Sequence, residues 1–142
     1  MADDFKFSPK IIPDASFILC CLFPDEQLNS EGKELFLSFS RGEIEFYAPL
    51  LLEIEILNGL RSAILSKRIS EKEAKILEDK FYDLEISGIT FEREKILDLS
   101  LKHKISVYDA VYLNCSQVRK MPVYTCDRKF YQKVKNDFRV FL

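Results

Sequence analysis

The sequence has no tryptophan, a single histidine and no Cys-x-x-Cys pair. Its cysteines are Cys20, Cys21, Cys115 and Cys126, and the histidine is His103. This spacing argues strongly against a structural zinc site, which needs clustered Cys and His ligands. A chain of this length does not need disulfides to stay folded, so we expect reduced thiols.

Long apolar runs and a strong excess of one charge are also missing. No segment approaches transmembrane length, and Asp3 and Asp4 stand where a secretory signal would be cationic. We therefore expect a cytoplasmic protein without membrane association. The formal net charge of −2 argues against nucleic-acid binding by the overall field, so any such binding would need a local basic patch.

The composition that remains is typical of a folded domain. Apolar residues make up 47% of the 142 residues and charged residues 31%, with twelve Phe and six Tyr available for a core. No linker, repeat or low-complexity tract divides the chain. We therefore predict one domain over 1–142, in which 1–9 form a loose N-terminal segment.

Short apolar runs alternate with one or two helical patterns along the chain. The runs predict strands at 10–14, 43–48, 84–87, 122–125 and 138–142. The helical patterns lie at 15–23, 29–39, 49–66, 70–82, 90–102 and 106–118. This order favours an α/β fold with helices on both faces of a parallel sheet. Sites in such folds lie at the carboxyl ends of the strands.

Four carboxylates stand out by their positions. Asp14 and Asp127 follow predicted strands, and Asp109 lies in the first turn of a predicted helix. Glu55 lies on a polar stripe of an otherwise apolar helix. Converging carboxylates repel one another unless a cation lies among them, and hard oxygen ligands suit Mg²⁺ or Mn²⁺. The pattern is that of a candidate metal site.

Each aspartate also has a simpler interpretation as part of a helix cap. Asp14 precedes a predicted helix, and Asp127 is positioned to cap a last turn. Ser106 and Asp109 have capping-box spacing, although Glu or Gln is the usual partner. Taken singly, a cap is the commoner role for such an aspartate. Spacing alone leaves both interpretations open.

Glu55 is harder to explain as a cap. Helical spacing places Glu55, Asn58 and Ser62 on one narrow stripe, and the apolar residues around it predict a largely buried helix. A buried carboxylate needs a cation, a hydrogen-bond network or a water-filled cleft. Glu53 lies in the first turn, where the helix dipole favours an acid, and we interpret it as structural. It remains the rival to Glu55.

Four motifs follow one another in the chain. They are Asp-x-Ser at 14–16, a Pro-led helix with Glu-x-x-Asn at 55–58, Tyr-Asp-Ala at 108–110 with a following aromatic, and Thr-x-Asp at 125–127. In this order they resemble the PIN-domain family of metal-dependent ribonucleases, in the small form found as VapC-like toxins of toxin–antitoxin pairs. The resemblance runs from Lys10 to the C-terminus.

The resemblance implies a three-layer α/β/α sandwich around a central parallel sheet, and hydrolysis of RNA phosphodiester bonds. It implies a catalytic and metal-binding set composed of Asp14, Glu55, Asp109 and Asp127. Three further positions match supporting polar residues of the family: Ser16, Asn58 and Thr125. Bound Mg²⁺ or Mn²⁺ would lower the pKa of a water and draw charge from the phosphoryl oxygens. The implied products carry a 5′-phosphate and a 3′-hydroxyl.

Basic residues crowd the last quarter of the chain. We select Arg119, Arg128 and Lys129 as candidate phosphate contacts. Each alone is typical of a solvated surface, and together they suggest a substrate rim. His103 lies outside every motif and is expected on the exposed polar side of its helix. The chemistry sketched here needs no histidine base.

Other functions fit less well or remain open. Ala15 and Ser16 follow Asp14, so the Asp-x-Asp of phosphatases and the paired acids of receiver domains are both missing. An RNA-processing nuclease outside a toxin pair and a catalytically silent PIN-like interaction module remain alternatives. The resemblance implies three partners: RNA, a small antitoxin and a second copy of the chain. Apolar residues at 17–23 and 35–39 are candidate contact surfaces, with core packing as the simpler interpretation.

Overall fold

Five parallel strands form one sheet in the computed structural model, which describes residues 9–141. The strands are β1 (Lys10–Pro13), β2 (Glu45–Ala48), β3 (Ser87–Gly88), β4 (Val123–Tyr124) and β5 (Val140–Phe141). The helices are α1 (Ala15–Leu22), α2 (Ser30–Ser40), α3 (Leu51–Leu65), α4 (Glu71–Asp83), α5 (Arg93–His103), α6 (Val107–Arg119) and α7 (Arg128–Val134). The predicted loose segment 1–9 lies, apart from its last residue, outside the described residues.

The strand order β3-β2-β1-β4-β5 creates a switch point in the sheet. From β1 the chain adds β2 and then β3 on one side, and it then crosses through α5 and α6 to add β4 and β5 on the other. The register pairs Ile11 with Phe46 and Ile12 with Val123. Ligand sites of open α/β sheets lie where the strand order reverses, which here is between β1 and β4.

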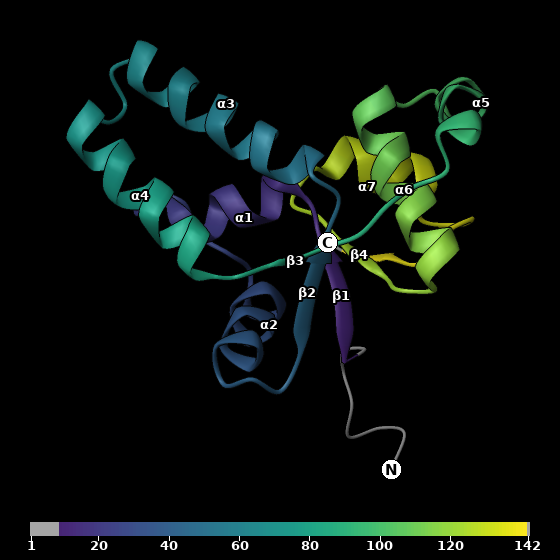
Figure 1. Cartoon of the computed structure of the whole chain (residues 1–142), viewed down its shortest axis with the longest axis horizontal. Helices are drawn as coiled ribbons and strands as arrows, with labels where there is room; N and C mark the ends of the chain where they lie inside the picture. The colour runs from purple at the N-terminus through teal and green to yellow at the C-terminus, as the bar shows by residue number, and fades with distance from the viewer. Residues whose placement is uncertain (1–8, 142) are drawn as a thin grey trace.

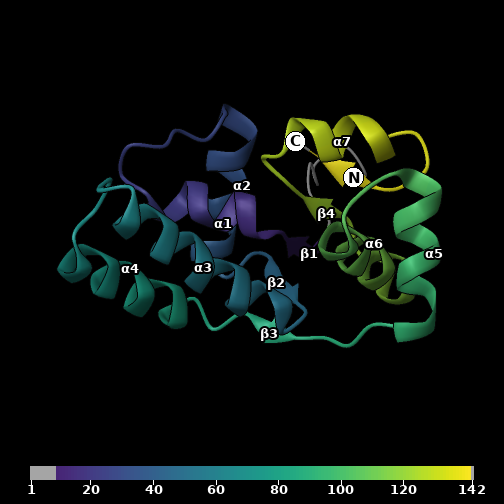
Figure 2. The ribbon, with the colours of Figure 1, turned by 90° about the horizontal axis from the view of Figure 1, so that it is seen from above.

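Helices cover both faces of the sheet. Helices α1 to α4 lie on one side, and α5 and α6 lie on the other (Figure 1). The view from above shows the same separation, with α3 and α4 running side by side as a long pair (Figure 2). Helix α6 packs on β1 and β4, and α7 packs beside β5. The predicted three-layer α/β/α sandwich with a parallel sheet is confirmed.

Aromatic side chains join α1 to both halves of the sheet. The Phe17 ring meets the Tyr124 ring edge-on at 5.0 Å and the Phe46 ring at 6.1 Å. Phe39 of α2 stacks on Phe46 with the ring centroids 4.0 Å apart. Burying one such side chain contributes about 1.5–3 kcal/mol, so these contacts fix α1 against β2 and β4. Core packing therefore claims Phe17, which the sequence also offered as partner surface.

Two segments differ from the predicted elements, one through its local backbone conformation and one through a tertiary contact. The strand predicted at 84–87 is reduced to Ser87–Gly88, since Glu85 has a left-handed backbone (φ 51°). The helix predicted from residue 90 begins at Arg93. The Glu92 amide is held by the Asn114 side chain at 2.6 Å, which keeps the preceding residues extended along α6.

Two expectations about exposure are wrong. Helix α3 is not largely buried, since Ile54 is 58% exposed and Leu65 64% exposed. Its neighbours α1 and α4 cover only part of its surface. His103 is not exposed either, because its ring lies edge-on to Phe138 at 4.9 Å and its side chain is only 9% exposed.

In the described part of the chain, no helix has the length and apolarity needed to cross a bilayer.

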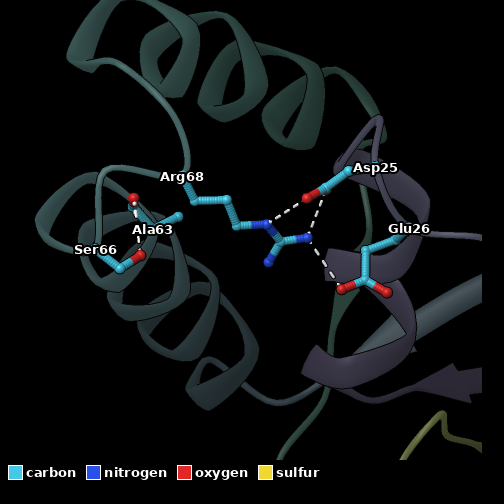
Figure 3. Close-up of polar contacts among 5 residues, drawn as sticks. All are labelled: Asp25, Glu26, Ala63, Ser66 and Arg68. Atoms are coloured by element: carbon cyan, nitrogen blue, oxygen red, sulfur yellow. Dashed lines mark hydrogen bonds and ion pairs between the residues drawn. The ribbon is translucent and has the colours of Figure 1, made fainter.

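Arg68 connects the loop after α3 to the loop after α1 (Figure 3). Its guanidinium donates to both oxygens of Asp25 at 2.6 and 2.8 Å and to Glu26 at 3.0 Å. It also lies 4.0 Å from the centre of the Phe23 ring. These ion pairs are largely solvent-exposed and individually weak, but their fork geometry fixes the far end of the α3–α4 pair.

Candidate functional site

Asp14 is buried at the junction of β1 and α1, with 5% of its surface exposed. Its Oδ1 accepts hydrogen bonds from the Phe17 amide at 3.0 Å and the Ser16 hydroxyl at 2.7 Å. Its Oδ2 accepts one from the Thr125 hydroxyl, and its amide donates to the Tyr124 carbonyl at 3.0 Å. Asp14 is therefore both the cap of α1 and part of a polar centre that spans β1 and β4.

The hydroxyls of Ser16 and Thr125 join Asp14 to the chain after β4. Each hydroxyl has one proton, and each directs it at Asp14, although the two oxygens are only 3.1 Å apart. Ser16 accepts from the Cys126 amide at 2.9 Å, and Thr125 accepts from the Asp127 amide at 3.0 Å. Both predicted supporting residues thus fix the loop that carries Asp127.

Asp127 and Asp109 occupy first turns of helices. Asp127 caps α7, since its Oδ1 accepts from the Phe130 amide at 3.1 Å. Asp109 lies in the first turn of α6, where its amide donates to the Ser106 hydroxyl at 3.0 Å. Both acids thus lie at helix starts, where the dipole stabilises negative charge. The predicted cap by Asp127 is present, whereas at Asp109 the cap is the Ser106 hydroxyl and, among the described residues, no bond from the Asp109 side chain completes a capping box.

Glu55 and Glu53 point to different neighbours. The Tyr112 hydroxyl of α6 donates to Glu55 Oε1 at 2.7 Å, which ties α3 to the helix of Asp109. Glu53 instead accepts from the Tyr82 hydroxyl of α4 at 3.2 Å. Glu55 is thus the glutamate on the Asp109 side. Asn58 is exposed, and within residues 9–141 no hydrogen bond joins it to the four acids.

Burial, with a contribution from neighbouring carboxylates, raises the pKa values of Asp14, Glu55 and Asp109. Burial raises the pKa of Asp14 to about 6, and the Asp109 charge adds to the shift. Burial and then the Asp127 charge raise the pKa of Asp109. Burial also raises the pKa of Glu55, with a further contribution from Asp109. Asp109 is therefore the member through which all four acids interact.

Two residues of this site were missing from the predicted set. Tyr112 lies three positions after Asp109 and hence on the same helical face, which was the available signal. The Lys133 charge lowers the pKa of Asp109 and so lies close to it, while its Nζ donates to the Lys104 carbonyl at 2.8 Å. Nothing local in the sequence distinguishes Lys133 from the other lysines of the last quarter.

The predicted basic rim is only partly assembled. Arg128 and Lys129 are exposed in the first turn of α7, directly after Asp127. Arg119 lies at the opposite end of α6, ten residues and about 15 Å along the axis from Asp109. Its Nη2 contacts the Thr90 hydroxyl at 3.4 Å. Arg119 therefore does not belong to this rim.

The donor set fits a hard divalent cation by its chemistry. All four candidate ligands are carboxylates, and a cation among them would relieve the repulsion that adds to the raised pKa values of Asp14, Glu55 and Asp109. Within residues 9–141, no three His, Cys, Asp or Glu side chains are already close enough to chelate one ion. Mg²⁺ usually keeps several waters, so fewer direct carboxylate ligands suffice.

Comparison with known families decides the class of this fold. A model of the PIN domain matches residues 11–136. The chain belongs to the PIN domain family. Ribonuclease VapC1 from two strains of Mycobacterium tuberculosis, CDC 1551 / Oshkosh and ATCC 25618 / H37Rv, is 31% identical over 84 residues. That match covers 58% of this PIN chain and 62% of the relatives' length.

Solved structures agree with this assignment. The crystal structure of PAE2754 from Pyrobaculum aerophilum has a TM-score of 0.71 at 16% identity, covering 93% of this chain and 83% of that one. FitAcB from Neisseria gonorrhoeae has a TM-score of 0.60 at 17% identity, covering 93% and 96%. At these identities the likeness supports the PIN fold alone. The resemblance seen in the four sequence motifs is confirmed.

Proposed function

We propose that this PIN domain is a divalent-metal-dependent endoribonuclease. The observation that carries the proposal is the buried Asp14 at the switch point between β1 and β4, whose pKa burial raises to about 6, with a smaller contribution from the Asp109 charge. A carboxylate held at such electrostatic cost has a clear use if a cation binds beside it. The partial identity to a protein named a ribonuclease supports RNA as the substrate class.

The side chains divide into ligands and supports in this proposal. The ligands are Asp14, Glu55, Asp109 and Asp127. Ser16 and Thr125 hold the Asp14 carboxylate in one rotamer, and Tyr112 does the same for Glu55. Bound Mg²⁺ or Mn²⁺ would activate water and neutralise phosphoryl charge. Such chemistry leaves a 5′-phosphate and a 3′-hydroxyl.

Substrate contacts come from exposed cations beside the acids. Arg128 and Lys129 lie one and two residues after Asp127, which places them to contact the RNA backbone. With a net charge of only −2 and acids in the site, a local rim is the means of holding a polyanion. Phosphate contacts of this kind carry no sequence preference by themselves.

We also propose that the chain is the cytoplasmic toxin of a toxin–antitoxin pair, held by a small antitoxin and active as a homodimer. The named relative supports this assignment. Leu97 and Leu101, one turn apart on α5, are 62% and 68% exposed and provide apolar surface for a partner. Three observations would support this role: a small upstream reading frame that encodes a DNA-binding protein, co-purification of the chain with that product, and a dimer in light scattering. A chain that purifies alone as a monomer refutes it.

Cleavage assays test the nuclease directly. Purified protein is incubated with single-stranded and structured RNA in Mg²⁺, in Mn²⁺ and in chelator. We expect metal-dependent cleavage that falls about a hundredfold or more in Asp14→Asn and Asp109→Asn. Asp98→Asn, an exposed acid on α5, is the matched control and should cut normally. Undiminished cleavage by the Asp14 and Asp109 variants would falsify the metal-site proposal.

A further inference from the structure

A pocket lies on the side of α3 that faces away from Glu55. Its volume is about 430 Å³, and it is bounded by the start of α3, the end of α4 and the segment that follows β3. Phe81, Ile86 and Ile89 contribute apolar wall. The charged lining residues are Glu53, Glu85 and Arg119. Mostly apolar pockets of this size with a few polar groups are typical of small-ligand sites.

The charged groups of this pocket are two carboxylates, Glu53 and Glu85, and one guanidinium, Arg119. Glu53 Oε1 accepts from the Tyr82 hydroxyl, and among the described residues no hydrogen bond reaches its Oε2. Arg119 makes one long contact of 3.4 Å to the Thr90 hydroxyl, which leaves most of its five donors for a ligand. Glu53, Glu85 and Arg119 are the charged residues that line the pocket, and none of them is one of the four acids of the candidate metal site.

Two large side chains at the edge of this pocket provide surface on which a flat nucleobase ring can stack. Leu50, which precedes the first residue of α3, is 73% exposed, and Tyr82 is 44% exposed. Exposed aromatic and apolar side chains beside a pocket provide surface for stacking of an unpaired base. Both line the same cavity as Glu53 and Arg119.

We propose that this pocket binds a guanine base of the RNA substrate. Guanine presents N1–H and N2–H donors on one edge, which suit the Glu53 carboxylate, and O6 and N7 acceptors on another, which suit Arg119. Uracil and cytosine are smaller, and adenine has no O6 for an arginine. The proposal rests on the proposed ribonuclease function for the source of the base.

The pocket and Glu55 lie on nearly opposite sides of α3. Glu53 and Glu55 are two residues apart on α3, so they point about 200° apart around an axis roughly 10–12 Å in diameter. A nucleotide near the cleaved bond could pass over the exposed Leu50 and place its base in the pocket. The pocket would then supply the base preference that the phosphate contacts of the rim lack.

To test the guanine pocket, nucleotide binding is measured under conditions that prevent RNA cleavage. Wild type, Glu53→Gln and Arg119→Gln are titrated with GMP, AMP, CMP and UMP in chelator by calorimetry. We expect wild type to prefer GMP by at least about fivefold, and both variants to lose that preference. Glu94→Gln, an exposed change on α5, is the control. Equal thermal unfolding of all four proteins excludes a folding defect.

Cleavage mapping separates this proposal from the nuclease itself. A series of short RNAs carries a single guanine at successive positions relative to a fixed cut site. In Glu53→Gln, the cleavage rate should no longer depend on the position of the guanine. A guanine-free RNA should be cut by this variant as fast as by wild type. Equal binding of the four nucleotides, or an unchanged preference in Glu53→Gln, overturns the guanine pocket. GMP-selective binding without any metal-dependent cleavage counts against the nuclease alone.

Discussion

Replacing Asp14 with asparagine should stabilise the fold at neutral pH. The pKa of Asp14 rises from 3.8 to about 6 on folding, which corresponds to about 3 kcal/mol. Because the folded state binds this proton more tightly, that stability is complete below pH 3.8 and is lost as the pH rises through 6. Above pH 7, the wild type therefore carries a charged, buried Asp14 at a cost that the variant avoids.

The substitution also removes one of the hydrogen bonds that Asp14 accepts. Its amide can accept from the Phe17 amide and from one hydroxyl, but its NH₂ forces Ser16 or Thr125 to stop donating, at about 1 kcal/mol. We therefore expect Asp14→Asn to be about 2 kcal/mol more stable than wild type at pH 8. Below pH 4 it should be about 1 kcal/mol less stable, so the two stability curves should cross.

Urea unfolding in chelator measures this difference. Since the chain has no tryptophan, far-UV circular dichroism from pH 3.5 to 8 is the suitable probe. The other shifted acids remain in both proteins, so most of their contribution cancels in the difference. Asp98→Asn, an exposed acid, should give a curve parallel to wild type. Parallel curves for Asp14→Asn as well would refute the reasoning.

Three further changes test single contacts. Thr125→Val removes the donor to Asp14 and the acceptor for the Asp127 amide, so urea unfolding should show a loss of about 2 kcal/mol that Thr125→Ser largely restores. Tyr112→Phe removes the hydroxyl that orients Glu55 and should weaken Mg²⁺ binding about tenfold in calorimetry, with an unchanged affinity contradicting that support role. Ser70→Ala breaks the capping box of α4 and should cost about 1 kcal/mol in thermal unfolding while RNA cleavage stays at the wild-type rate.

Features set by local chemistry could be predicted from the sequence. The Ser70–Glu73 capping box forms with both of its hydrogen bonds, because its groups are three residues apart. Asp14 and Asp127 lie where strand-then-acid spacing placed them, at the ends of neighbouring parallel strands. A cap and a position at the carboxyl end of a strand do not exclude each other, since Asp14 and Asp127 each cap a helix while following neighbouring parallel strands.

Features set by contacts between distant segments could not be predicted. The start of α5 depends on the Asn114 side chain 22 residues after Glu92. The burial of His103 depends on Phe138, which lies beyond the last helix. Glu53 was a weak rival to Glu55 on the helical wheel, and only Tyr82 of another helix shows which way it faces. Periodicity carries no information about such partners.

The pairing of β1 with β4 has a consequence during synthesis of the protein. Asp14 leaves the ribosome early, whereas its partner Thr125 is made 111 residues later. Translation at about 5–20 residues per second separates the two by several seconds. During that interval Asp14 lacks the Thr125 hydroxyl and the neighbouring strand β4, and Asp127 does not yet exist. The contacts that join Asp14 to the chain after β4 can thus form only after Asp127 has been made.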